Sequence, residues 1–84
     1  MKRNPDYVLR EIAGETVLVP VSGDFNGIIA LNEIGAEIYR RIDECPTAEQ
    51  LTDALCELYD APRQVIAEDT AAFLRQMKEE NIIL

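Results

Sequence analysis

The sequence lacks histidine and is poor in basic residues, and both scarcities narrow the functions open to it. Histidine is the commonest general base and metal ligand, so its absence removes much of ordinary enzyme chemistry. The 84 residues include 8 lysines and arginines against 16 aspartates and glutamates, which gives a net charge of −8. We therefore expect no nucleic-acid or membrane partner, because phosphate backbones and anionic lipids attract proteins largely through basic side chains.

Cysteine and long apolar segments are also scarce. Cys45 and Cys56 alone cannot close a structural zinc site or build a disulfide framework. The N-terminal residues carry charge with no apolar run behind them, so they do not resemble a signal peptide. The longest apolar stretch, residues 17–21, is far too short to span a membrane. We expect a cytoplasmic protein with reduced thiols and no metal or other cofactor.

The sequence does contain enough apolar residues for one folded domain. Apolar residues make up 48% of the chain, which is close to the average of globular proteins and argues against disorder. At this length a single hydrophobic core of modest stability is expected. We see no linker or repeat, so residues 1–84 are expected to form a single domain.

The first part of the chain has the composition of strands. Residues 7–13 and 16–21 are rich in β-branched and other apolar residues, with Gly14-Glu15 as the expected turn between them. Pro20 cannot donate to a ladder, so it should lie near the end of its strand or point toward solvent. Turn-forming residues 22–27 precede a third short strand, residues 28–31. The short connections predict an antiparallel sheet in the order 1-2-3.

The rest of the chain has helical periodicity. Asn32 is a good N-cap for a first helix that should end near Asp43. Thr47 and Gln50 fit a capping box at the start of a second helix. Pro62 is expected as the first residue of a third helix that runs to about Glu80. Beyond it, Asn81 is expected to stop the helix, and the apolar residues 82–84 should dock on the body.

The third helix has an apolar arc that is wider than one core contact requires. Ile66, Thr70, Phe73 and Met77 share its centre at 100° per residue, and Ile66, Phe73 and Met77 are therefore expected in the core. Small and apolar residues extend the arc on both sides. Such a helix either packs centrally on two sides or lines a groove that stays open for a partner.

Three short motifs resemble those of a known family. Residues 31–38, LNEIGAEI, look like the "LNxxGxxI" signature that opens the first helix of the PqqD-like proteins of pyrroloquinoline quinone biosynthesis and their relatives. Residues 47–51, TAEQL, resemble the family's "T-x-E-E-I" start of the second helix. Asp69, Phe73, Met77 and Asn81 follow the spacing of its C-terminal motif, with Met77 in place of leucine and Asn81 in place of glycine. The resemblance covers residues 7–84.

The resemblance implies a winged-helix-like α+β fold, in which a three-stranded antiparallel sheet is followed by three helices. Members are not enzymes but recognition elements for ribosomally made, post-translationally modified peptides. They bind the leader segment of a precursor peptide and present it to a modifying enzyme, often a radical S-adenosylmethionine protein. The leader adds as a strand to the third strand, beside the third helix. An unguarded strand edge suits this mode of binding.

Carried onto this sequence, the resemblance places the peptide on the edge of the third strand. The expected contacts of that edge are Gly27, Ile28, Ile29, Ala30 and Leu31. On the third helix we favour the flank that mixes small and polar side chains, which comprises Val65, Asp69, Ala72 and Gln76. The opposite flank is the alternative, and it comprises Ala67, Ala71, Leu74 and Lys78. Asn32 and Gly35 are expected to be structural, with Gly35 allowing close approach of another backbone.

Three other functions compete with peptide recognition. A winged-helix DNA-binding regulator would use the third helix for recognition, but the net charge opposes this. A small-molecule enzyme would need a nucleophile and a base, and no such pair can be named. A homodimer without a peptide ligand could form through the same strand edge or by swapping.

Overall fold

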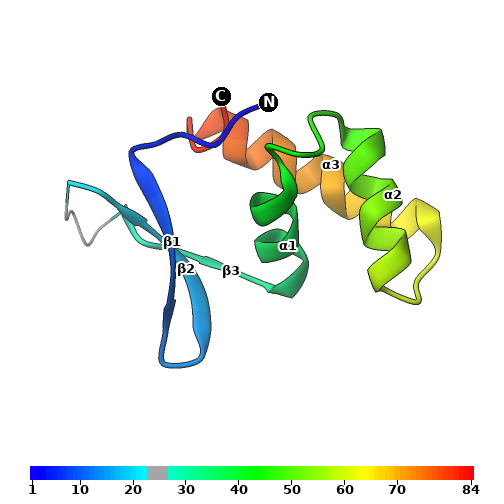
Figure 1. The fold of residues 1–84 in the computed structure, drawn as a ribbon, viewed down its shortest axis with the longest axis horizontal. Helices are drawn as coiled ribbons and strands as arrows, with labels where there is room; N and C mark the ends of the chain where they lie inside the picture. Colours follow the sequence, from blue (N-terminus) through cyan, green and yellow to red (C-terminus); the bar gives the residue numbers. More distant parts are fainter. Residues whose placement is uncertain (23–26) are drawn as a thin grey trace.

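The computed structural model describes residues 1–22 and 27–84, and the expected turn over residues 22–27 therefore lies mostly outside the described residues. The sheet lies at one end of the molecule and the helices pack beside it (Figure 1). The elements are β1 (Tyr7–Ile12), β2 (Glu15–Pro20), β3 (Ile29–Leu31), α1 (Glu33–Arg41), α2 (Ala48–Leu58) and α3 (Arg63–Glu79). The sheet is antiparallel in the order β1-β2-β3, which confirms the predicted α+β order of strands and helices.

The β1–β2 hairpin closes through Ala13 and Gly14, not through the expected Gly14-Glu15 pair. Ala13 has φ +54° and Gly14 has φ +82°, as a two-residue type I′ turn requires. Ile12 and Glu15 are consequently opposite each other as the last pair of the ladder. The sequence expectation failed because a positive φ is uncommon for alanine, so Ala13 carries no turn signal of its own.

The hairpin determines which way each backbone group of the sheet points. The Val21 N–H donates to the Asp6 carbonyl at 2.8 Å, so this pair is a hydrogen-bonded one. Because such pairs alternate in antiparallel ladders, Val19 and Val17 bond toward β1, whereas Leu18 and Thr16 bond toward β3.

Pro20 ends β2, as expected of a residue that cannot donate to a ladder. By the same alternation its missing N–H faces β3, at a position beyond the last recorded pair of that ladder, Leu18 with Ile29. A Cβ at Gly27 would lie 2.7 Å from Cγ of Pro20, so the chain passes closely here. Pro20 and Gly27 thus mark the place where the β2–β3 ladder stops.

The predicted caps of the first two helices are present. The Gly35 N–H donates to Oδ1 of Asn32 at 2.7 Å, which caps α1. The Gln50 N–H donates to Oγ1 of Thr47 at 3.1 Å, and the Thr47 N–H donates to Oε1 of Gln50 at 3.3 Å, which completes the capping box. Helix α1 ends at Arg41, slightly earlier than expected.

Helix α3 begins one residue later than expected, and the chain stops it where predicted. Pro62 is the residue before the helix and not its first residue. Asn81 has φ +59°, the left-handed conformation that ends helices and that asparagine tolerates.

One core joins the sheet to all three helices. Leu18 supplies its centre from the sheet, and it is fully buried. The other buried members are Ile38, Tyr39, Ile42, Leu51, Leu55, Ile66, Leu74, Met77, Ile82 and Ile83. One face of the sheet therefore packs on the helical layer.

The C-terminal residues dock on the N-terminal segment. Lys2 and Leu84 exchange two backbone hydrogen bonds, of 3.0 and 2.8 Å, and Arg3 forms a bridge with Ile83. Ile82 and Ile83 are buried, as predicted, but Leu84 is 58% exposed. The two termini consequently lie together (Figure 1).

Helix α3 is rotated relative to the sequence expectation. Its buried side chains are Ile66, Thr70, Leu74 and Met77. Phe73 is only half-buried, so its predicted place in the core is wrong, and Leu74, assigned to a flank, is 5% exposed. The neighbours of α3 bury a stripe displaced toward Leu74, which leaves Phe73 at its border.

No helix in the described part of the chain combines the length and the apolar character needed to cross a membrane.

The cap of α1 can be tested by replacing Asn32. Asn32→Ala removes the acceptor for the Gly35 N–H and should lower the free energy of unfolding by about 0.5–2 kcal/mol. Asn32→Ser retains an acceptor at the cap and should preserve most of the stability. Urea denaturation of the three proteins measures the difference, and equal stability of the alanine variant would contradict the assignment.

Candidate functional site

The third strand forms a free edge of the sheet. β3 pairs with β2 on one side only, since it is last in the strand order. Because Ile29 and Leu31 bond toward β2, the N–H and C=O of Ala30 point away from the sheet. The side chain of Ala30 is exposed. A single residue in the middle of β3 therefore offers a backbone donor and an acceptor to an added strand.

Two adjoining depressions lie between this edge and α3. The first is lined by Ile29, Ala30, Leu31, Asn32, Phe73, Gln76 and Met77. The second, with a volume of about 280 Å³, is lined by Asn32, Ile34, Gly35, Asp69, Ala72, Phe73 and Gln76. They share Asn32, Phe73 and Gln76, and we call them together the β3–α3 groove. The groove puts an apolar wall next to the free backbone groups of Ala30.

Phe73 stands between the two halves of the groove, and Gly35 makes room for its ring. A Cβ at Gly35 would lie 2.8 Å from Cε2 of Phe73 and 3.1 Å from Oδ1 of Asn32. The close neighbour of Gly35 is therefore an aromatic side chain of α3, not the backbone that the sequence suggested. With no side chain at this position, the ring can rest against α1 while its other face remains in the groove.

The structure brings together most of the residues singled out from the sequence. Ile29, Ala30 and Leu31 line the groove from the strand. Asp69, Ala72 and Gln76 line it from α3. Gly27, Ile28 and Val65 line neither depression, and Val65 is a solvent-exposed apolar residue.

The alternative flank of α3 lies away from the groove. None of its members, Ala67, Ala71, Leu74 and Lys78, lines either depression. Leu74 is buried, and Ala71 and Lys78 are exposed elsewhere. The geometry thus favours the flank that contains Asp69 and Ala72 as the wall that faces β3.

Several groove residues were not assigned to the site from the sequence. Asn32 and Gly35 were expected to be structural only, and both also line the groove. Phe73 and Met77 were expected in the core, and Ile34 was seen only as part of a helical stripe. The sequence position of α1 could have indicated its residues, because the first turn of this helix follows β3 directly and must lie beside the end of that strand.

The groove contains little charge. Asp69 is the ionisable residue among its lining side chains, and it is exposed. Within residues 1–22 and 27–84, no cluster of three or more histidine, cysteine or acidic residues could hold a metal ion. The groove therefore has the features of a binding surface, with backbone groups on one side and apolar side chains on the other.

Helix α3 lacks the basic surface of a DNA-recognition helix. Arg63 is paired with Asp53 at 2.6 Å, which leaves it unavailable to a phosphate unless the pair opens. The remaining basic residues of α3, Arg75 and Lys78, share the helix with Glu68, Asp69 and Glu79. The basic and acidic side chains of α3 therefore nearly cancel, whereas a helix that binds DNA needs an excess of positive charge facing the phosphates.

Comparison with known proteins identifies a family. The family described as "Coenzyme PQQ synthesis protein D (PqqD)" matches residues 15–83. A search of curated proteins gave no match.

Two solved structures share the fold. TbiB1 in complex with the TbiA(beta) leader peptide is 26% identical, with a TM-score of 0.78 over 99% of this chain and 94% of that chain. A lasso peptide synthetase B1 complexed with the leader peptide is 22% identical, with a TM-score of 0.79 over 99% of this chain and 95% of that chain.

The close contact between Gly35 and Phe73 predicts a stability effect. Gly35→Val should lower the free energy of unfolding by about 1–3 kcal/mol, because its Cβ would overlap the Phe73 ring and crowd Oδ1 of Asn32. Ala71→Val is the control, since it puts the same valine side chain at an exposed helical position. Thermal unfolding compares the two, and an equal effect of both would show that the ring contact is unimportant.

Proposed function

Since the chain belongs to the coenzyme PQQ synthesis protein D (PqqD) family, we propose that it binds the leader segment of a ribosomally made precursor peptide in the β3–α3 groove. The observation that carries the proposal is the exposed backbone of Ala30 beside an apolar groove. TbiB1, which is similar over nearly the whole chain, was solved with a leader peptide.

The leader adds to the sheet as a further strand. Its backbone donates to the C=O of Ala30 and accepts from the N–H of Ala30, so the sheet is extended at its free edge. Because β3 has only three residues, this ladder is short, and main-chain bonds supply little of the affinity. Side chains of the leader must therefore provide most of it.

Alternate side chains of an added strand point to opposite faces of the sheet. Those on the helical side enter the β3–α3 groove, where the half-buried Phe73 offers apolar contact. Gln76 can hydrogen-bond the leader's backbone at the border between the two depressions. This arrangement selects leaders with apolar residues two positions apart.

Asp69 adds a charge preference to the apolar selection. Its carboxylate lies in the half of the groove farther from Ala30, next to Ala72 and Gly35. A leader with lysine or arginine at the matching position gains a complementary charge, which acts mainly on specificity and association rate. A leader with an acidic residue there is disfavoured.

The role of the chain is recognition, with the chemistry performed by a partner. The groove offers a strand edge, apolar side chains and one carboxylate, which suit binding and not group transfer. By family resemblance, the partner is a modifying enzyme, such as a radical S-adenosylmethionine enzyme, to which the leader-bound precursor is presented.

A proline at Ala30 tests strand addition. Ala30→Pro removes the outward N–H of β3 and should abolish binding of the cognate leader peptide, measured by titration calorimetry. Ala30→Val retains the N–H and should bind. Ile29→Pro is not equivalent, because its N–H bonds toward β2 and its loss damages the sheet itself. A folded Ala30→Pro variant with unchanged affinity would refute the strand model.

A tryptophan on α3 tests which flank faces the leader. Ala72→Trp should fill the β3–α3 groove and weaken leader binding by at least about tenfold, the equivalent of roughly 1.4 kcal/mol. Ala71→Trp places the same side chain on an exposed position outside the groove and should bind normally. Circular dichroism confirms that both variants fold. Loss of affinity in the Ala71 variant alone would place the leader on the opposite flank.

A further inference from the structure

The sheet has a second free edge, on β1. Val8 and Arg10 bond toward β2, so the backbone groups of Leu9 and Glu11 point outward. Among the described residues, no backbone group pairs with the outward N–H of Leu9 or with that of Glu11. At six residues, β1 is twice as long as β3 and offers more positions for an added strand.

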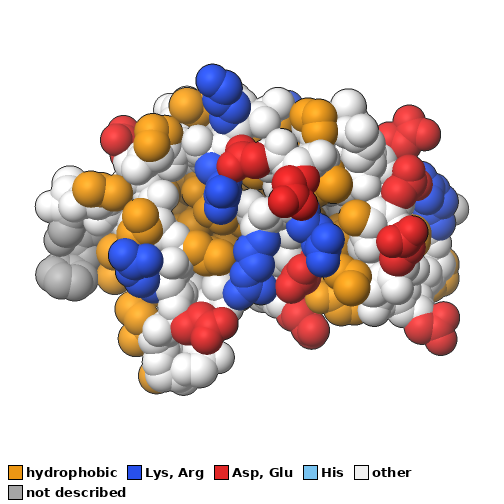
Figure 2. Space-filling view, viewed as in Figure 1, with side chains coloured by type: hydrophobic (Ala, Val, Ile, Leu, Met, Phe, Trp, Pro, Cys, Tyr) orange, Lys and Arg blue, Asp and Glu red, His pale blue; other side chains and the backbone are white. Residues whose placement is uncertain are grey.

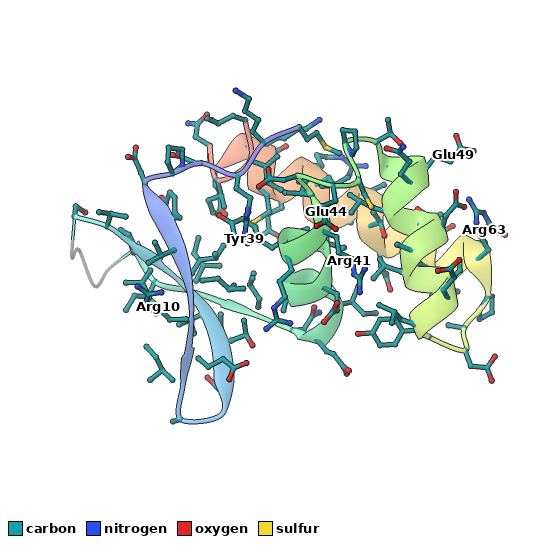
Figure 3. The ribbon with its side chains drawn as sticks, in the orientation of Figure 1. Arg10, Tyr39, Arg41, Glu44, Glu49 and Arg63 are labelled. Carbon is teal, nitrogen blue, oxygen red and sulfur yellow. The ribbon has the colours of Figure 1, made fainter. Side chains whose placement is uncertain are left out.

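A hollow of about 490 Å³ lies beside this edge, between β1 and α1. Leu9 and Arg10 line it from the strand, Arg3 from the N-terminal segment, and Tyr39 and Asp43 from α1 and the turn after it. Figure 2 shows hydrophobic side chains on its floor and basic side chains around it. Figure 3 shows Arg10 and Tyr39 on its two sides. We call it the β1 hollow.

Tyr39 lines this hollow, and its hydroxyl has an unmet hydrogen-bonding capacity. The residue is 1% exposed, and its hydroxyl is buried without any hydrogen-bond partner. The Arg3 guanidinium lies 5.7 Å from the centre of its ring. Burial raises the pKa of the Tyr39 hydroxyl, against the opposing effect of Arg3, so the group stays protonated and able to donate. A buried donor without an acceptor is costly, and a ligand carbonyl or carboxylate would relieve that cost.

The β1 hollow also differs in charge from the rest of the molecule. Arg3 and Arg10 line it against Asp43 alone, in a chain whose net charge is −8. Asp43 is paired with Arg3 at 2.8 Å. No carboxylate of the described residues pairs with Arg10, whose guanidinium donates instead to the Leu9 carbonyl at 3.3 Å.

The neighbouring hollow at the other end of the hairpin shows the contrast. It lies between the hairpin and α1, and its ionisable residues are Glu11, Glu15, Glu33, Glu37 and Arg40. An acidic ligand would be repelled there and attracted to the β1 hollow.

We propose that the free edge of β1 and the β1 hollow bind an extended, acidic segment of a partner protein, added to the sheet as a strand. The segment's backbone bonds to Leu9 and Glu11, and one of its oxygens accepts from the Tyr39 hydroxyl once the side chains that cover this group move aside. Arg10 leaves the Leu9 carbonyl and pairs with a carboxylate of the segment. Because this edge is on the far side of the sheet from β3, the partner and a leader peptide can be bound together.

A partner protein suits this edge better than a second copy of the chain. Two copies would each bring a net charge of −8, which repels at long range. Pairing of β1 with its own copy would also bring Arg10 of both chains toward the same short ladder, where like charges are unfavourable. A short acidic segment carries less charge than a second copy, it is attracted locally by Arg3 and Arg10, and it places no arginine opposite Arg10.

The probe is a short amidated peptide of alternating valine and glutamate, titrated into isotope-labelled protein and followed by amide chemical shifts. The matched control replaces every glutamate by lysine. We expect shifts at Leu9, Arg10 and Glu11 with the glutamate peptide and much smaller ones with the lysine peptide. Equal shifts with both peptides, or none on β1, would overturn the proposal.

Two variants of the hollow sharpen the test. Tyr39→Phe removes an unpartnered hydroxyl, so thermal stability should be kept or raised, while affinity for the glutamate peptide falls about fivefold. Arg10→Glu should abolish the preference for glutamate over lysine. Unchanged affinity and preference in both variants would reject the β1 hollow as the binding site.

Two further controls distinguish peptide binding at β1 from binding at β3 and from pairing with a second copy of the chain. Ala30→Pro blocks the β3 edge and should leave binding of the glutamate peptide intact; its loss would show that the peptide binds at β3. Shifts on β1 that grow with protein concentration in the absence of peptide, with a dimer in sedimentation, would identify a second copy as the occupant and overturn the proposal. Leader binding is measured separately, so either proposal can fail alone.

Discussion

The two-residue turn at Ala13 and Gly14 is the constraint on which the binding surfaces depend. It makes Ile12 and Glu15 a pair, and from there the alternation of an antiparallel ladder sets the direction of every backbone group in the sheet. A turn longer by one residue would shift β2 against β1. The groups that β2 presents to β3 would then change, and with them the residue that β3 turns outward at the proposed site of strand addition.

The helical layer turns one of these edges into a shaped site. Asn32 caps α1 immediately after β3, so the helix begins at the strand's end and Gly35 lies in its first turn. The absence of a side chain at Gly35 leaves room for the ring of Phe73 from α3, so α3 packs closely against the first turn of α1 beside the edge. The contacts that begin α1 therefore also shape the groove.

Local sequence signals predicted the elements, but the rotation of α3 depends on tertiary packing. The capping box at Thr47 and the stop at Asn81 could be predicted, because each acts through its own backbone neighbours. Phe73 and Leu74 could not be assigned correctly, since adjacent positions on one apolar arc differ only in which neighbours cover them. The partner of Gly35 was unpredictable for the same reason. The free edge of β3 could be predicted from the expected strand order. Which of its residues turns its backbone groups outward could not, because that depends on the register of the hairpin.

A domain with two free edges must also avoid pairing with itself. β3 is too short to template a stable sheet, with only three residues. On the longer β1, the Arg10 guanidinium covers the Leu9 carbonyl and places a charge at the edge. The net charge of −8 adds long-range repulsion between copies. These features oppose unspecific association. The two proposed ligands would overcome them, the leader through side-chain contact at β3 and the acidic segment through a carboxylate at β1. The acidity of the chain therefore opposes the pairing of identical copies, whereas Arg3 and Arg10 make the β1 hollow locally favourable to the acidic segment proposed for it.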